Sequence, residues 1–335
     1  RIASAGPALV NGSILANGGN GFGNHGGGGA GGAISIACSS FHGTNGVLSA
    51  IGGNGNNVNG GGGGGGRISV RYSEALQAAV PVPSLFFSAL GGTATILQYS
   101  GEPGTLHFPD TRLLADANGF LRSSGTLAIP GFTSWDLDRL VVSNSYLFLP
   151  DDFVLNVTND LVLSGTSPTT HKLVARGGEI NAGSLRLDKN AGLEIYADIV
   201  SDPSMPGAQV NVTGEMFIGQ NAWVYPVSHP TNGGSVKFTV GSLDVNATGG
   251  FDATGRGFQG GAGWYSGSPA GYSDGYGPGH GGWVSGTPYQ VFSKGSGAGH
   301  GGLGVQNTPV YGLTYGDYTA PVQPGSGGAG GDATS

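Results

Sequence analysis

The stretch that decides the fold is residues 14–36, ILANGGNGFGNHGGGGAGGAISI, because it recurs at an offset of 34 as LSAIGGNGNNVNGGGGGGGRISV, residues 48–70. The two copies align without gaps, and 13 of their 23 aligned pairs are identical. Each copy ends in a short apolar-polar alternation, Ile34-Ser-Ile36 or Ile68-Ser-Val70, which is typical of a β-strand. A fixed period of this length indicates a solenoid, in which equivalent residues lie in adjacent coils.

The middle of the chain has a second regularity, in which apolar-x-apolar triplets occur in pairs. The pairs are Leu161–Leu163 with Leu173–Ala175, Leu185–Leu187 with Leu193–Ile195, Met216–Ile218 with Trp223–Tyr225, and Leu243–Val245 with Phe251–Ala253. The first triplets begin at 161, 185, 216 and 243, and the resulting steps of 24, 31 and 27 suit one coil of a parallel β-helix. We therefore expect an all-β solenoid. Because alternation alone does not separate parallel from antiparallel pairing, a β-sandwich is the alternative fold.

The composition limits the classes of function. Glycine accounts for 70 of 335 residues and charged residues for only 10%, which excludes an ordinary enzyme composition, and no Gly-X-Y period indicates collagen. A net charge of −7 with 13 Lys and Arg leaves too little positive charge for a nucleic-acid partner. No run of about 20 apolar residues occurs, so no membrane insertion is expected. A single cysteine, Cys38, is expected to be a buried small residue.

Glycine is distributed unevenly, with 24 in the range 1–66, 20 in the range 67–254 and 26 in the range 255–335. This division predicts a glycine-rich repeat over residues 1–73 and β-solenoid coils over residues 136–254. Residues 74–135 are expected to be an irregular or β insert, with two helical turns at Glu74–Val80 that Pro81 ends. Residues 255–335 form a glycine- and aromatic-rich segment that continues into a following unit.

The run Gly60–Gly66 has no side chain with which to bind or catalyse, so its chemistry is backbone hydrogen bonding. Extended polyglycine helices can pack closely enough to bond to one another laterally. The offset of 34 then places Gly26–Gly32 beside Gly60–Gly66, in a layer that includes Gly26, Gly29, Gly32, Gly60, Gly63 and Gly66. Two other interpretations are a chain passing tightly over a β-helix face and a flexible linker.

The two ends of the chain match each other. Residues 325–331, GSGGAGG, equal residues 26–32, GGGGAGG, at six of seven positions. Within the chain, 13 residues lead from Gly32 to the next Asn-Gly pair. If the C-terminus were followed by the N-terminus of another copy, 15 residues would lead from Gly331 to the next such pair. We therefore expect copies of the chain to join head to tail, as a tandem repeat or as stacked subunits. The residues expected at this contact are Gly325, Gly327, Gly328, Gly330 and Gly331 on one side and Ile2, Leu9, Asn11, Gly12 and Ile14 on the other.

Several motifs resemble one known group of proteins. They are residues 11–67, Asn221-Ala-Trp-Val-Tyr-Pro226 followed by Gly233-Gly234, Gly255-Arg-Gly-Phe-Gln-Gly-Gly261, and Tyr315-Gly-Asp-Tyr-Thr-Ala-Pro-Val-Gln-Pro-Gly-Ser-Gly-Gly328. The chain resembles the glycine-rich β-helical modules of very large secreted or surface proteins, mainly of environmental bacteria. This resemblance implies a structural or adhesive role outside the cell or on its surface. It offers no catalytic residue.

The histidines do not predict catalysis. His280 and His300 lie in twin Gly-His-Gly-Gly motifs, and His25 precedes another glycine run, but residues 275–316 contain no acidic side chain. A polysaccharide-degrading β-helix needs two or three carboxylates near its site. We expect structural histidines that bond glycine backbone, no catalytic centre and no cofactor, so the chain is not expected to be an enzyme.

Three further features are candidates for binding or modification. Gly327–Asp332 begins like a calcium-binding nonapeptide, but the motif occurs once, so no metal site is expected and Asp332 is the one calcium candidate. Seven tyrosines between residues 265 and 318 could pack in the core, form an assembly contact or bind glycans. Four sequons permit glycosylation in a eukaryotic host, at Asn11, Asn156, Asn211 and Asn246.

Together these observations predict a structural repeat unit of an extracellular fibre or giant surface protein. Its main partner is another copy of itself, and glycans are a second possible partner. A glycan-binding adhesin module is the alternative function, and a polysaccharide-degrading enzyme is the third.

Overall fold

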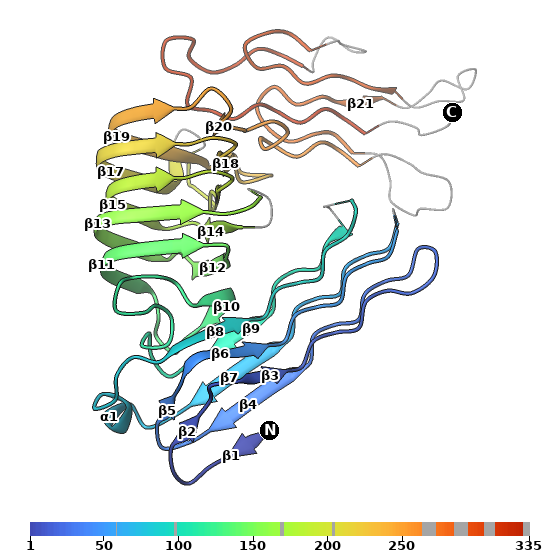
Figure 1. The fold of residues 1–335 in the computed structure, drawn as a ribbon. Coiled ribbons are helices and arrows are strands. Elements are labelled where there is room, and N and C mark those ends of the chain that lie inside the picture. Colours follow the sequence, from blue (N-terminus) through green and yellow to red (C-terminus); the bar gives the residue numbers. More distant parts are fainter. Residues whose placement is uncertain are drawn as a thin grey trace.

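The computed structural model of the protein describes residues 1–57, 59–96, 99–167, 171–202, 205–262, 273–284, 294–304 and 312–330. These residues form an all-β column of stacked coils, with a short helix, α1 (Glu74–Gln77), beside it (Figure 1). One path of ten strands runs the length of the column. It comprises β1 (Ile2–Ala3), β4 (Ala33–Ala37), β7 (Arg67–Arg71), β9 (Thr105–His107), β10 (Ser123–Ala128), β12 (Tyr146–Asp151), β14 (Lys172–Arg176), β16 (Gly192–Tyr196), β18 (Trp223–Val227) and β20 (Gly250–Phe251).

Further strands form the other sides of the coils. A five-stranded sheet comprises β11 (Ser134–Ser143), β13 (Val154–Ser164), β15 (Glu179–Leu187), β17 (Pro206–Ile218) and β19 (Ser235–Val245). Near the N-terminal end, β3 (Ser13–Leu15), β6 (Thr44–Ser49) and β8 (Ser84–Ser88) pair in order, and β2 (Ala8–Leu9) pairs with β5 (Phe41–His42). In the C-terminal segment, β21 (Trp283–Val284) and β22 (Lys294–Gly295) form an antiparallel pair. No helix in the described part of the chain has the length and apolarity to cross a membrane.

The register confirms the predicted solenoid. Every ladder of the column is parallel, which excludes the β-sandwich. Ile34 pairs with Ile68, as the offset of 34 predicts. Leu161, Leu185, Met216 and Leu243 pair in succession, so the predicted steps between their triplets are the offsets between successive coils.

The core is a continuous column of apolar side chains inside the coils. Equivalent positions of neighbouring strands stack into ladders whose members are fully buried, for example Leu147, Leu173, Leu193 and Val224. Burying each such side chain contributes about 1.5–3 kcal/mol. Cys38 differs from its prediction, because it is only half-buried at the edge of this core. This partial burial raises the pKa of its thiol.

The segment from residue 74 to 135 carries the column onward. It contains α1, where the sequence predicts two helical turns, and the strands β8, β9 and β10. Strand β8 pairs with β6 and β10, and β9 pairs with β7 and β10, so both strands join the repeat to the middle of the chain. Only the fragment Ser88-Ala-Leu-Gly-Gly92 resembles the glycine-rich repeat, by its match to Ser49-Ala-Ile-Gly-Gly53, so the segment carries too little of the pattern to be assigned to a coil from the sequence.

The predicted packed glycine layer extends from the N-terminal coils (Figure 1). Its hydrogen bonds join six chain segments in two rows, with residues 16–22, 50–56 and 89–95 in one row and residues 26–32, 60–66 and 99–104 in the other. Hydrogen bonds link neighbours within a row, such as Gly28 N–H to Gly61 O at 2.8 Å, and link the two rows, such as Gly63 N–H to Gly53 O at 2.9 Å. Both glycine runs therefore lie side by side in a hydrogen-bonded array.

The donors of this layer follow a three-residue period. Gly62 and Gly65 donate to Tyr99 and Glu102 of their own row, whereas Gly63 and Gly66 donate to Gly53 and Ala50 of the other row. Three residues per turn is the period of a polyproline II helix, which presents every third residue to the same neighbour. A similar layer forms in the C-terminal segment, where Gly281 N–H donates to Gly327 O at 3.0 Å and Gly327 N–H to Tyr276 O at 2.8 Å.

Candidate functional site

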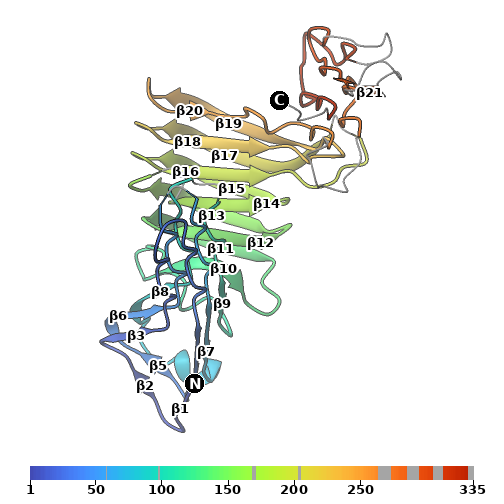
Figure 2. The ribbon, with the colours of Figure 1, turned by 90° about the vertical axis from the view of Figure 1, so that its right-hand side faces the viewer.

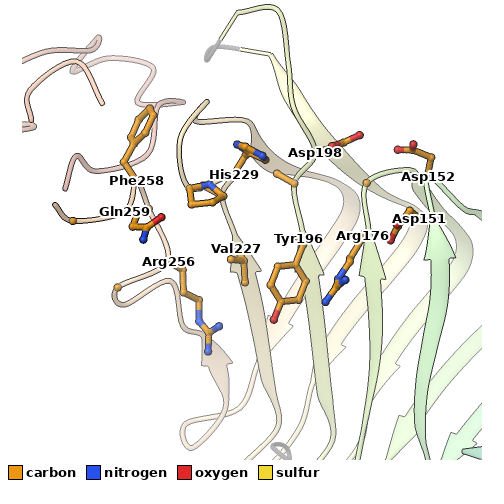
Figure 3. A pocket seen from close by; sticks show the side chains of 17 residues that line it. Asp151, Asp152, Arg176, Tyr196, Asp198, Val227, His229, Arg256, Phe258 and Gln259 are labelled. Carbon is orange, nitrogen blue, oxygen red and sulfur yellow. The ribbon is translucent and has the colours of Figure 1, made fainter. Parts of the chain in front are cut away.

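A groove follows the outer face of the ten-strand path. It consists of two adjoining hollows of about 780 and 620 Å³, both lined by Arg176 and Tyr196. The larger hollow is closed on one side by residues 255–260 of the C-terminal segment (Figure 3). The smaller hollow reaches residues 90–93 and 100–103 of the glycine layer.

The stacked register builds the floor of the groove. Asp151, Arg176, Tyr196 and Val227 pair in order across β12, β14, β16 and β18. Their side chains form a row in Figure 3, and Arg256 extends this row beyond Val227. Side chains of a strand alternate between its two faces, so residues that pair across successive strands point to the same face. These four paired residues therefore form one row of the floor. Residues that are a whole coil apart in sequence thus become neighbours.

A network of charged groups holds the centre of the floor. The Glu194 side chain is only 7% exposed, and it is paired with Lys172 and with Arg256, the latter at 3.4 Å. The Tyr196 hydroxyl donates to Glu194 Oε1 at 2.9 Å. Burial, together with the Glu194 charge and hydrogen bond, raises the pKa of Tyr196 to about 12. The carboxylate is therefore compensated, as a buried charge must be.

Arg176 has a different environment. Its guanidinium lies 5.7 Å from the Phe148 ring centroid and 5.4 Å from that of Tyr196. None of the ion pairs among the described residues includes Arg176, although its side chain lines both hollows. A guanidinium carries five N–H donors in a planar fork. Among the described residues no side-chain hydrogen bond or ion pair uses these donors, so they are available to a ligand in the groove.

Three aspartates lie at the rim of the larger hollow, namely Asp151, Asp152 and Asp198. The pKa of Asp152 is raised by its partial burial, by the charge and hydrogen bond of Asp198, and by the charge of Asp151. Asp198 also accepts the backbone N–H of Ile199 at 2.7 Å. Within the pair, Asp152 is the carboxyl group whose pKa is raised.

His229 lines the same hollow. Its Nδ1 accepts the backbone N–H of Asn232 at 3.1 Å, so the neutral ring carries its proton on Nε2. The prediction that the chain is not an enzyme relied on the absence of carboxylates near a histidine in sequence. The fold does place His229 in one groove with the three aspartates, but these are exposed, and the prediction stays untested. Within the described ranges no group of three or more His, Cys, Asp or Glu is arranged to hold a metal ion.

Sequence reasoning missed this groove because its residues come from four different coils. The signal that could have found them was the register itself. Aligning the coils by the steps between their apolar triplets would have placed Arg176 beside Tyr196 and both near the Asp151-Asp152 pair.

The residues predicted for the glycine layer all take part in it. Gly29 and Gly32 donate to Gly19 and Ala16, and Gly26 O accepts the backbone N–H of Asn56 at 2.8 Å. Gly60 lies against Gly26, since a Cβ on Gly60 would come within 2.4 Å of Gly26 O. Gly63 and Gly66 bond as described above.

The residues predicted for self-assembly lie in two different settings. Ile2 and Leu9 are exposed at the N-terminal end of the column, and Ile14 is partly buried there. At the same end, Asn11 Oδ1 accepts the Thr44 N–H at 3.0 Å, and Gly12 O accepts that of Val47 at 2.9 Å.

The glycines predicted as the other half of that contact bond within their own chain. Gly325 O accepts the Phe258 N–H, Gly328 O accepts the Gly261 N–H, and Gly330 N–H donates to Ser273 O at 3.2 Å. Gly327 is bonded to Tyr276 and Gly281. Gly331 and the calcium candidate Asp332 lie outside the described residues.

The structure places the remaining predicted residues as follows. His280 Nδ1 donates to Gly277 O at 2.8 Å, in line with a histidine that bonds glycine backbone. The His300 ring packs on Tyr315 with centroids 4.6 Å apart, and His25 has a left-handed φ of 63° beside its glycine run. Four of the seven tyrosines of the aromatic stretch 265–318 lie outside the described residues.

Two sequon asparagines belong to a ladder along the five-stranded sheet. Asn156 Nδ2 donates to Asp136, Asn181 Nδ2 to Asn156, and Asn211 Nδ2 to Asn181, at 2.7–2.9 Å. A glycan would attach to the nitrogens of Asn156 and Asn211 that make these bonds. The Asn11 and Asn246 side chains are exposed and use their oxygens as acceptors.

No model of a known protein family, no curated protein and no solved structure matches the chain. The resemblance to glycine-rich β-helical modules therefore stays a prediction from the sequence motifs alone.

Proposed function

We propose that the chain is a structural unit of an extracellular fibre or giant surface protein, and that its copies follow one another head to tail. The observation that carries this proposal is that the column has an open sheet edge at each end. The extracellular location rests on the motifs and their resemblance.

At the N-terminal end, β1, β2 and β3 each pair on one side only. This end exposes Ile2, Leu9 and Leu15, with Leu9 69% exposed. We call the surface of these three residues the head. Proteins rarely leave such an edge uncovered, because unpaired strand groups and apolar side chains recruit another chain.

At the opposite end, β19 pairs only with β17, and β20 only with β18, among the described residues. This end exposes Leu243, Val245 and Phe251, with Leu243 50% exposed, and we call it the tail. Figure 2 shows the tail at the top of the column, with the C-terminal segment displaced to one side. The head of one copy on the tail of another would continue the parallel ladders with the same polarity, and such a contact propagates as a filament.

The test uses one variant for each end. Leu9→Asp places a charge on the head, Val245→Asp places one on the tail, and Ile199→Asp is the control because Ile199 is exposed in a loop away from both. Sedimentation velocity over a range of concentrations should show growing assemblies for the wild type and the control. Each end variant alone should stay monomeric, while their equimolar mixture should form dimers, since one good head and one good tail remain.

Two results would contradict the proposal: a wild type that is monomeric at every concentration, or end variants that assemble as the wild type does. A third variant, Gly325→Asp, examines the alternative contact, because a Cβ at Gly325 meets no atom within 4 Å. If Gly325→Asp abolished assembly and Val245→Asp did not, the contact with the head would be made by the C-terminal glycine run instead of by the tail.

A further inference from the structure

We propose that the groove binds one linear polysaccharide chain of neutral sugars, laid along the axis of the column. This role goes beyond the structural one, and it uses residues other than the aromatic stretch 265–318. Shape, floor chemistry and charge each support it.

The groove has the shape that a polymer needs. Its two hollows share Arg176 and Tyr196, so they form one continuous channel from the glycine layer to residues 255–260. The channel crosses four strands of the ten-strand path, from β12 to β18, which at the usual strand spacing is about 14 Å. Several sugar rings of one chain fit within that length.

The floor offers flat apolar surfaces. Tyr146, Phe148 and Tyr196 line the smaller hollow, with the Tyr146 and Phe148 ring centroids 5.1 Å apart. The Arg176 guanidinium lies within 5.7 Å of the Phe148 and Tyr196 ring centroids, so its flat face adds to this surface. Sugar rings present C–H faces that pack on such planes, while their hydroxyl groups point sideways.

The groove also offers partners for sideways hydroxyl groups. A hydroxyl donates one hydrogen bond and accepts others, so it needs donors and acceptors together. Arg176 supplies uncommitted donors, and the Asp152–Asp198 pair supplies acceptors at the rim. Hydrogen bonds to charged groups of this kind are the stronger ones in protein sites.

The distribution of charge selects for neutral sugars. The aspartates at the rim repel a polyanion, and Arg176 on the floor repels a polycation. Glu194 is already neutralised by Lys172 and Arg256, so it adds no free charge. A neutral chain meets neither repulsion.

The experiment is affinity electrophoresis through gels that contain soluble mixed-linkage β-glucan, xylan, galactomannan or alginate. It uses the Val245→Asp chain as background, so that the result does not depend on filament formation. Arg176→Ala removes the exposed donors from the floor. Arg186→Ala is the matched control, because Arg186 stacks on Phe217, 4.2 Å from its centroid, in the other sheet.

We expect at least one of the three neutral polysaccharides to retard the parent chain and the Arg186→Ala variant equally. Arg176→Ala should bind that polysaccharide about tenfold more weakly. Binding to none of them, or equal retardation of Arg176→Ala and the parent, would overturn the proposal. Stronger binding to alginate than to the neutral polysaccharides would overturn the selection for neutral sugars. Release of reducing ends would show that the groove hydrolyses the polysaccharide, which would overturn a role in binding alone.

Discussion

Neighbouring glycines of one run have opposite surroundings. A Cβ on Gly63 would lie 2.1 Å from Gly29 O and 2.5 Å from Gly29 C, a separation that real atoms do not adopt. A Cβ on Gly64 would meet nothing within 4 Å. The absence of a side chain is therefore a packing requirement at one position and not at the next.

We predict that Gly63→Ala lowers the free energy of unfolding by about 2–4 kcal/mol, and that Gly63→Val lowers it further, through overpacking together with a lost hydrogen bond between neighbouring segments. Gly64→Ala is the matched control and should change stability by less than about 1 kcal/mol. Urea unfolding followed by circular dichroism measures both. Equal effects of the two alanine variants would disprove the close packing at Gly63.

The Asp152–Asp198 pair predicts a pH dependence. Since the folded state raises the pKa of Asp152 above its ordinary 3.8, the folded protein holds this proton more tightly than the unfolded chain does. The resulting stability is full below pH 3.8 and is lost as pH rises through the raised pKa. Burial and Asp151 keep part of this effect, but Asp198→Asn removes the main charged neighbour, so we expect the loss of stability to become smaller.

Melting temperatures from about pH 3 to about pH 7 measure this difference. Asp138→Asn provides the control, since Asp138 is an exposed aspartate on β11 outside the groove. The control should keep the wild-type pH profile. An unchanged profile in Asp198→Asn would show that Asp198 does not raise the pKa of Asp152.

At the scale of elements, the glycine layer behaves as a folded unit although it contains little regular strand. Some amides donate to the next segment of the same row, and others donate to the other row. An amide that faces neither row has no such acceptor and can exchange its proton with water. Gly62, Gly63, Gly65 and Gly66 donate to backbone oxygens, whereas Gly61 and Gly64 donate to no group in the described part of the chain.

We therefore predict a three-residue period in amide hydrogen exchange across residues 60–66. Amides of Gly62, Gly63, Gly65 and Gly66 should exchange slowly, and those of Gly61 and Gly64 rapidly, as residue-resolved NMR would measure. Uniformly rapid exchange over the run would support the flexible-linker interpretation instead.

At the scale of the whole molecule, the column is a stack in which each coil contacts mainly its neighbours. Deleting residues 17–50 removes one full period of the repeat and joins Ala16 to Ile51, so β3 then lies where β6 paired with β8. We predict that this deletion variant still folds and unfolds cooperatively at a lower temperature, because a solenoid loses stability roughly coil by coil.

Deleting residues 21–50 instead is the control. It removes four fewer positions than the period, so β3 and residues 16–20 fall four residues out of register with β8 and residues 89–95, and the N-terminal coil should not stack on the rest. Thermal unfolding and hydrogen exchange of both variants measure the difference. If the two deletions behaved alike, the period would not determine the stacking.

The sequence by itself determined the order and register of the stack. The offset between Ile34 and Ile68 and the steps from Leu161 to Leu243 are the strand pairings of the structure, because in a parallel solenoid identical local patterns must lie one coil apart. The neighbouring glycine runs follow from the same offset.

Only the tertiary structure decided where the irregular coil and the loops lie. The coil built on β8 and β9 keeps only a fragment of the glycine repeat, Ser88-Ala-Leu-Gly-Gly92 against Ser49-Ala-Ile-Gly-Gly53, so its place depends on packing against β6 and β7. Likewise, the register places Arg176 beside Tyr196, but Asp198 and residues 255–260 lie in loops that no strand pairing aligns. They join the groove only in the folded chain, because the alternation within a strand does not determine the path of the loop that follows it.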